Sequence, residues 1–230
     1  MRILLVALMV VFTAFAGASV RAADLPEYPD IQVPEVDYGL QGGFYLRGSA
    51  AANLLWSQEH VSLGCACTDK PTAPGYGYSI GAGFGYEIGN GLRVDGTVDY
   101  LSNDGLTDGI NTLHLRAGVA LANAYYDFPI SGGGSAGGGF GAYLGAGAGA
   151  AWYTTHVTGV GSPADGGGWS PAVAAMAGVT YDMGTWVADL GYRMIYMPKI
   201  SNYAATPQTP WYLNDNTVSE IRASVRYRLQ

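Results

Sequence analysis

The sequence contains few of the residues that usually carry catalysis or bind metals. Its 230 residues include two cysteines and three histidines, and 13% of them are charged. G-x-S-x-G matches at 77–81 and 133–137 lack the strand–turn–helix context of a nucleophile elbow, and Gly-x-Gly matches such as 145–149 lack the strand–helix context of a nucleotide site. A net charge of -7 argues against the basic footprint that nucleic-acid binding needs. We therefore expect neither an enzyme nor a protein with a cofactor or a bound metal.

Long apolar runs are also scarce. Ile3 to Ala18 is the one run that approaches the roughly 20 residues of a membrane-spanning helix. Residues 1–22 therefore read as a signal peptide that begins with the positive Arg2, and an uncleaved anchor is the alternative. Residues 23–41 are acidic and proline-bearing, which predicts an extended periplasmic tail.

Glycine and tyrosine are abundant instead, with 35 and 17 residues. So much glycine with so little charge is unusual for a soluble domain, and a mean hydropathy of +0.12 is too low for a helical membrane protein. A membrane barrel explains both values, because every second residue of its strands faces a polar interior.

The clearest pattern lies in residues 76–101, which predict two strands and a tight turn. In the first arm the even positions, from Tyr76 to Ile88, are apolar or aromatic, and the odd positions are small or polar. The second arm continues this alternation with charged residues at odd positions. Successive side chains of a strand point to opposite faces, so the hairpin has one apolar and one polar face.

Three features of this hairpin favour a membrane barrel over a soluble sandwich. Tyrosines lie at the ends of the apolar faces, where an interfacial aromatic belt would be. The first arm exceeds the usual strand length of about 5–6 residues and matches a membrane strand of roughly 9–11. Glycines accompany charges on the polar face, as a narrow lumen requires.

The hairpin also predicts its own register. A three-residue loop, 89–91, would pair Ile88 with Leu92 and place Glu87 opposite Arg93 on the polar face. The sequence therefore predicts an ion pair between Glu87 and Arg93 inside the barrel.

The alternation continues in further segments, and the chain is predicted to be all-β, an eight-stranded antiparallel transmembrane β-barrel of residues 42–230. In the segment near 113–122 we expect Leu113 to Leu121 to form the outward apolar row and His114 and Arg116 to face inward. Residues 127–139 are predicted to be a glycine-rich connection. Long connections near 56–75, 102–111, 154–168 and 197–217 are expected outside the cell, and short turns at 89–91 and 184–185 in the periplasm.

Many charged residues are expected to face the lumen. They are Arg47, Glu87, Arg93, Asp95, Asp99, Arg116, Asp182, Asp189, Arg193, Glu220, Arg222, Arg226 and Arg228. An eight-stranded barrel is just wide enough for its side chains to fill it, which predicts an ionic plug. A narrow or gated channel is the alternative.

Several segments occur in a telling order: AADLPEYP after the signal, then GGFYLRGSAA, NAYYDF, YLGAGAGAAWY, ADLGYRMIYM and the closing SEIRASVRYRL. Together they resemble the small outer-membrane β-barrel family of Gram-negative bacteria, relatives of the OmpA transmembrane domain. The resemblance implies a porin-like eight-stranded barrel without enzymatic activity, usually a structural or surface-antigen protein. The family usually ends on an aromatic residue that the assembly machinery recognises, whereas this chain ends Leu229-Gln230.

The remaining candidate residues have plain interpretations. Cys65 and Cys67 lie in the first outer loop, with His60 and Asp69 nearby. A disulfide across one intervening residue would be strained, and a metal site would need the cluster to converge, so an inert or intermolecular thiol is expected instead. His114 is expected to be a hydrogen-bonded interior residue, and His156 lies in or near an outer loop without a partner motif.

These observations predict a structural outer-membrane barrel of surface-antigen type that supports the envelope and displays its outer loops. Its expected partners are outer-membrane lipid and lipopolysaccharide, the barrel assembly machinery, and a host or surface ligand of the loops. The alternatives are an adhesin that uses the loop 203–212, a lipid hydrolase with a Ser–His pair on the outer rim, and a narrow channel.

Overall fold

The structure, a computed structural model, describes residues 42–62, 67–131, 139–159, 165–201 and 211–229. The predicted signal peptide and tail lie outside these residues. Among the described residues there is no helix long and apolar enough to cross a membrane.

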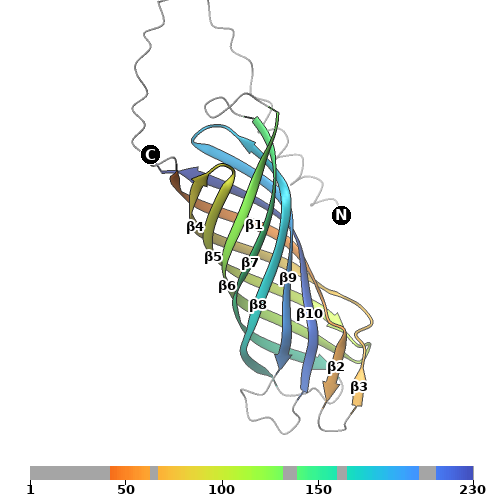
Figure 1. Cartoon of the computed structure of the whole chain (residues 1–230). Helices are drawn as coiled ribbons and strands as arrows, with labels where there is room; N and C mark the ends of the chain where they lie inside the picture. The colour runs from red at the N-terminus through yellow and green to blue at the C-terminus, as the bar shows by residue number, and fades with distance from the viewer. Residues whose placement is uncertain (1–41, 63–66, 132–138, 160–164, 202–210, 230) are drawn as a thin grey trace, which may run out of the picture. The chain divides into compact units, whose positions relative to one another are not determined.

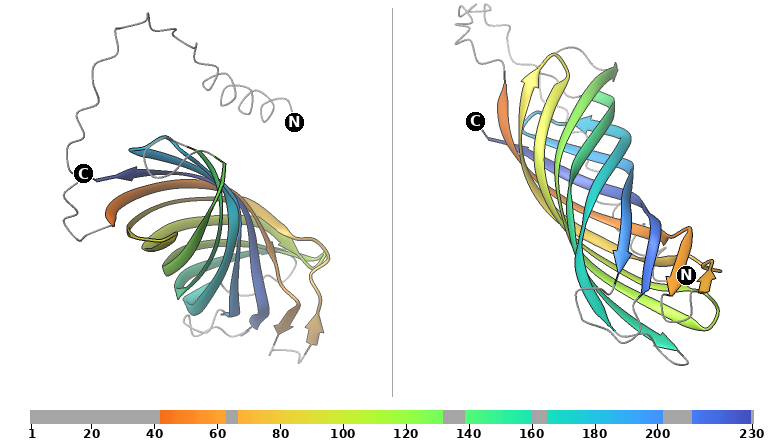
Figure 2. Two further views of the ribbon diagram at one scale, coloured as in Figure 1. Left: turned by 45° about the horizontal axis from the view of Figure 1, so that its top comes forward. Right: turned by 60° about the horizontal axis from the view of Figure 1, so that its bottom comes forward.

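The described residues form ten strands. They are β1 (Gly43–Trp56), β2 (Glu59–Ser62), β3 (Cys67–Asp69), β4 (Gly75–Gly89), β5 (Leu92–Thr107), β6 (Asn111–Ser131), β7 (Gly139–Gly159), β8 (Gly166–Asp182), β9 (Trp186–Ser201) and β10 (Trp211–Arg228). Strands β1 and β4 to β10 pair in order with antiparallel neighbours (Figure 1). β10 also pairs with β1, and the two lie side by side in Figure 2, so these eight strands close into the predicted barrel.

The barrel has two distinct ends. At one, which we call the turn end, β4 turns into β5 and β8 into β9. At the other, the loop end, β2 adds to the edge of β10 and β3 adds to β2 (Figure 1). The segment predicted as the loop 56–75 therefore contains a short β-hairpin that extends the wall of the barrel.

The turn between β4 and β5 differs by one residue from the predicted one. Gly89, not Ile88, pairs with Leu92, and a bulge lies between Glu87 and Gly89. Asn90 and Gly91 have φ values of 51° and 82°, the left-handed conformations that a two-residue type I′ turn requires. The bulge absorbs the extra residue, so the predicted register of Glu87 opposite Arg93 is confirmed.

Several strands are longer than predicted, and the connections are correspondingly shorter. β6 continues to Ser131, through the first five residues of the predicted connection 127–139, while 132–138 lie outside the described residues. β5 and β6 leave three residues between them, where the Asp108 carboxylate accepts hydrogen bonds from the backbone N–H groups of Ile110 and Asn111. These hydrogen bonds from the backbone to a side chain stabilise a short turn at the place where the sequence predicted a longer loop.

The predicted orientation of side chains is confirmed on seven of the eight barrel strands and is wrong on β6. There, Leu113, Leu115 and Val119 are buried inside the barrel, and His114 and Arg116 face outward. The pairing with β5 determines which side chains of β6 face inward, because Asn123 lies opposite Asp95 and both are interior residues. The apolar row was assigned to the outside on hydrophobicity alone, but the interior at the loop end is itself apolar.

Outward aromatic side chains gather at both ends of the barrel. Near the turn end they are Phe44, Tyr126, Phe128, Phe140, Tyr181, Trp186 and Tyr227, and near the loop end Trp56, Tyr76, Tyr78, Tyr100, Trp152 and Trp169. Between them the exposed side chains are apolar, including Leu46, Ile80, Val98, Leu144, Val173, Leu190 and Ile221. β1, with 14 residues, rises about 3.3 Å per residue and, tilted about 40°, spans roughly 35 Å, enough to cross a bilayer core.

Candidate functional site: the barrel lumen

The lumen has two layers of different chemistry. Toward the turn end it is filled by charged and polar side chains, and toward the loop end by apolar ones. Of the thirteen charged residues predicted to face the lumen, all but Arg116 do so.

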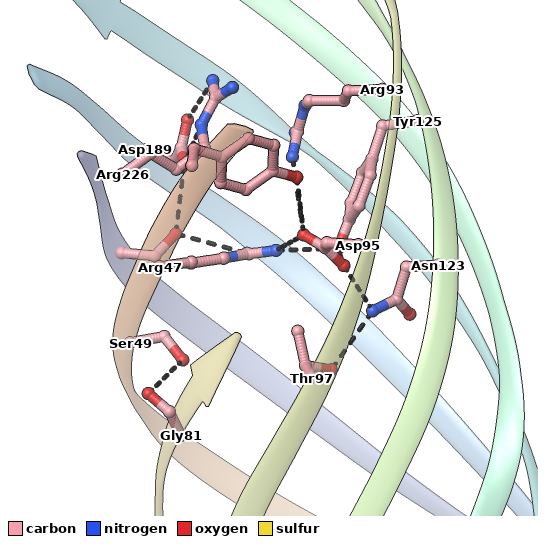
Figure 3. A network of polar contacts seen from close by, with 12 residues as sticks. Arg47, Ser49, Gly81, Arg93, Asp95, Thr97, Asn123, Tyr125, Asp189 and Arg226 are labelled. Carbon is pink, nitrogen blue, oxygen red and sulfur yellow. Dashed lines mark hydrogen bonds and ion pairs between the residues drawn. The ribbon is translucent and has the colours of Figure 1, made fainter. Parts of the chain in front are cut away.

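Asp95 is the centre of the first polar network. Its carboxylate accepts hydrogen bonds from Arg47 (3.2 Å), the Tyr45 hydroxyl (2.9 Å) and the Asn123 side-chain amide (2.8 Å). Figure 3 shows Arg47 and Asp95 pointing toward each other across the lumen, with Asn123 and Tyr125 beside them on β6. Residues of β1, β5 and β6 are thereby joined through one buried carboxylate.

Four buried charges form a second network. Arg193 donates hydrogen bonds to Asp99 (2.7 Å) and Glu220 (2.6 Å), and Arg222 donates to the same two carboxylates (2.7 and 3.3 Å). The Ser79 hydroxyl donates a further bond of 2.7 Å to Glu220. Two positive and two negative groups alternate around this quartet, so each buried charge is balanced by two of opposite sign.

A third network lies at the turn end. Arg226 binds both Asp189 (3.1 Å) and Glu87 (2.8 Å). Arg228, the last residue of β10, binds Glu87 and Asp182, each at 2.8 Å. These bonds connect β4, β8, β9 and β10 across the interior.

The predicted ion pair between Glu87 and Arg93 is wrong, although their register is right. Glu87 binds Arg226 and Arg228, whereas Arg93 donates a hydrogen bond to Asp127 (2.8 Å). The Arg93 guanidinium also lies 3.8 Å from the centre of the Tyr125 ring, a cation–π contact. Long side chains reach beyond the residue directly opposite, to another position on the next strand or past it, so strand register alone does not choose their partners.

These contacts predict a specific pattern of energetic coupling. In double-mutant cycles with Glu87→Ala, Arg226→Ala and Arg93→Ala, we expect Glu87 and Arg226 to couple by about 0.5–3 kcal/mol, because they share a charged hydrogen bond. Glu87 and Arg93 should couple clearly less. Reversible unfolding in detergent measures both values, and a stronger coupling of Glu87 with Arg93 would contradict the pairing described above.

The apolar layer closes the loop end of the lumen. Its largest members include Leu55, Leu101, Leu115, Ile195, Met197, Ile200 and Trp211. Asp215 has a φ of 52° within β10, and the alternation shifts there, so that Leu213 and Asn216 both face inward. A cavity of about 40 Å³ remains at this end, lined by residues that include Leu106, Leu113, Val157 and Trp211.

The apolar layer bears on the alternative that the protein is an adhesin acting through the loop 203–212. Residues 202–210 of the proposed binding loop lie outside the described residues, but Trp211 is 1% exposed and packs inside the barrel. It contributes to the core of the protein and is not a displayed aromatic residue.

His114 and His156 lie outside the lumen, on the outward side of the loop end, so the expectation that His114 is an interior residue is wrong. His114 binds Asp104, and His156 binds Asp165. The hydrogen bond from His156 lowers the pKa of Asp165 below its ordinary value, and one from the Val157 N–H adds to this. The hydroxyl bound to His114 is that of Thr158, 3.5 Å from Nε2, and among the described side chains no serine is hydrogen-bonded to His114 or His156 as in the Ser–His pair of a hydrolase.

The part of the chain that the structure describes contains no group of three or more His, Cys, Asp and Glu residues arranged to hold a metal ion. Cys65 lies outside it, and the side chains of His60 and Cys67 are not described either.

No protein-family model and no curated protein matches the chain. Among solved structures, Neisserial surface protein A is 24% identical over 81% of this chain and 97% of its own, with a TM-score of 0.53. OprG from Pseudomonas aeruginosa is 17% identical over 81% of this chain and 97% of its own, with a TM-score of 0.47. Ail, the attachment invasion locus protein of Yersinia pestis, is 16% identical over 81% and 99%, with a TM-score of 0.42. The first of these likenesses shows that the fold is that of the small outer-membrane β-barrels.

Proposed function

We propose that the chain is a structural barrel of the Gram-negative outer membrane, which supports the envelope and displays its loop end to the exterior. The observation that carries this proposal is a closed ring of strands with an apolar outer surface between two sets of aromatic side chains. Exposure of such an apolar surface to water would cost free energy, whereas in a bilayer the same surface contacts the apolar lipid tails.

The interior supports a structural role over transport. The polar networks fill the turn end, and the apolar layer fills the loop end. A passage for solutes would require breaking the quartet of Asp99, Arg193, Glu220 and Arg222, whose ion pairs are buried.

The partners of this barrel follow from its surfaces. The apolar outer surface is suited to outer-membrane lipid and the exterior side to lipopolysaccharide. The barrel assembly machinery would insert it, guided by the outward apolar row Ile221, Val225 and Tyr227 of the last strand. The β2–β3 hairpin, which extends past the ring at the loop end, supports a second candidate function, the binding of a surface ligand.

The protein should be found in the outer-membrane fraction and should change its migration on SDS gels when boiled. The closed hydrogen-bonded ring resists detergent until heat opens it, so the unboiled protein stays compact. Gel migration of each cell fraction with and without boiling measures both properties. A soluble periplasmic protein with identical migration in both lanes would contradict the proposal.

A further inference from the structure

Four side chains form a row across the outward side of the loop end. Asp104 on β5 lies opposite His114 on β6, and His114 lies opposite His156 on β7. Asp165, next to the start of β8, completes the row. Both histidines are accessible, because their side chains are 35% and 61% exposed. Neither takes part in the polar networks of the lumen.

Each imidazole is held by a carboxylate on its far side. His114 Nδ1 lies 2.7 Å from Asp104 Oδ1, and His156 Nδ1 lies 2.6 Å from Asp165 Oδ2. Since a carboxylate accepts the hydrogen bond, Nδ1 carries the proton of each neutral ring and Nε2 keeps its lone pair. This is the arrangement in which a carboxylate orients a histidine that binds a metal.

The carboxylates lie on the outer sides of the pair, toward β5 and β8. His114 Nε2 faces β7, where its partner is the Thr158 hydroxyl at 3.5 Å. A metal ion between the two strands would replace this long contact and take Nε2 of His156 as its second ligand. The two ring centres are 6.0 Å apart. With Zn–N bonds of about 2.0–2.1 Å, two rings bound to one zinc ion have centres about 5–6 Å apart. A small tilt of either ring would therefore bring both Nε2 atoms within bonding distance of one ion.

The local charge also favours a cation. Asp104 and Asp165 carry two negative charges, and the neighbouring cation Arg116 is itself bound to Asp104 at 2.9 Å. From these observations we propose that His114 and His156 form a binding site for a divalent transition-metal ion, such as Zn²⁺, at the loop end. The two Nε2 atoms are the protein ligands and waters complete the coordination, which leaves positions open for exchange or for a further ligand.

The test is calorimetric titration of the untagged full-length mature protein in detergent with Zn²⁺ alone. We expect one site, whose affinity falls at least tenfold in His114→Ala and in His156→Ala and is lost in the double variant. Asp165→Asn, which keeps both ligands but removes the orienting carboxylate, should weaken binding by about 10–100-fold. Boiled and unboiled gel migration verifies that each variant is folded.

A matched control separates this site from the other zinc-binding side chains of the chain, whose third histidine is His60. A variant with His60→Ala, Cys65→Ser and Cys67→Ser should bind Zn²⁺ like the unchanged protein. Loss of binding in that variant, unchanged binding in the double histidine variant, or no binding by the unchanged protein would each overturn the proposal.

Discussion

Replacing Glu220 by alanine should lower the free energy of unfolding by about 3–5 kcal/mol. The carboxylate is fully buried, and it accepts hydrogen bonds from Arg193, Arg222 and Ser79. Its removal leaves two buried guanidinium groups facing the single carboxylate of Asp99. An uncompensated buried charge is costly because neither water nor a partner stabilises it.

Urea unfolding in detergent or lipid measures this loss. Glu59→Ala is the matched control, since Glu59 is an exposed residue of β2 and its replacement should change stability by less than about 0.5 kcal/mol. If Glu220→Ala were as mild as the control, the quartet would not be a buried network.

Replacing Trp211 by alanine should cost a similar amount, about 3–5 kcal/mol. Its side chain is buried in the apolar layer with Leu213 and lines the same cavity as Leu113 and Val157, which alanine would enlarge. Trp211→Phe keeps a ring in the same space and should lose less than half as much. The same unfolding experiment measures both variants, and a loss below about 1 kcal/mol for Trp211→Ala would mean that this side chain is not part of the core.

The strand pattern was predictable from the sequence because membrane strands alternate with period two over many residues. The hairpin of β4 and β5 carried enough polar and apolar contrast to fix its faces and the register of Glu87 with Arg93. In β6 the contrast between apolar and polar residues predicted the wrong inward face. Its apolar row faces a lumen that is apolar at that level, so hydrophobicity could not tell inside from outside.

The partners within the lumen were not predictable from strand register. Glu87 binds arginines of β10, more than a hundred residues away in the chain, because closure of the barrel leaves only β1 between β4 and β10. The reach of an arginine side chain exceeds the spacing of neighbouring strands, so several partners compete. The row of Asp104, His114, His156 and Asp165 was also not predicted. His156 has no nearby motif, and the inward and outward sides of β6 were assigned the wrong way round.

Conductance across a planar lipid bilayer tests most directly the claim that this is a membrane barrel with a filled lumen. The purified protein, inserted and verified as folded by its gel migration, should give no porin-sized conductance steps, because charged networks and an apolar layer occupy the interior. Stable porin-sized openings of the unchanged protein would contradict this account.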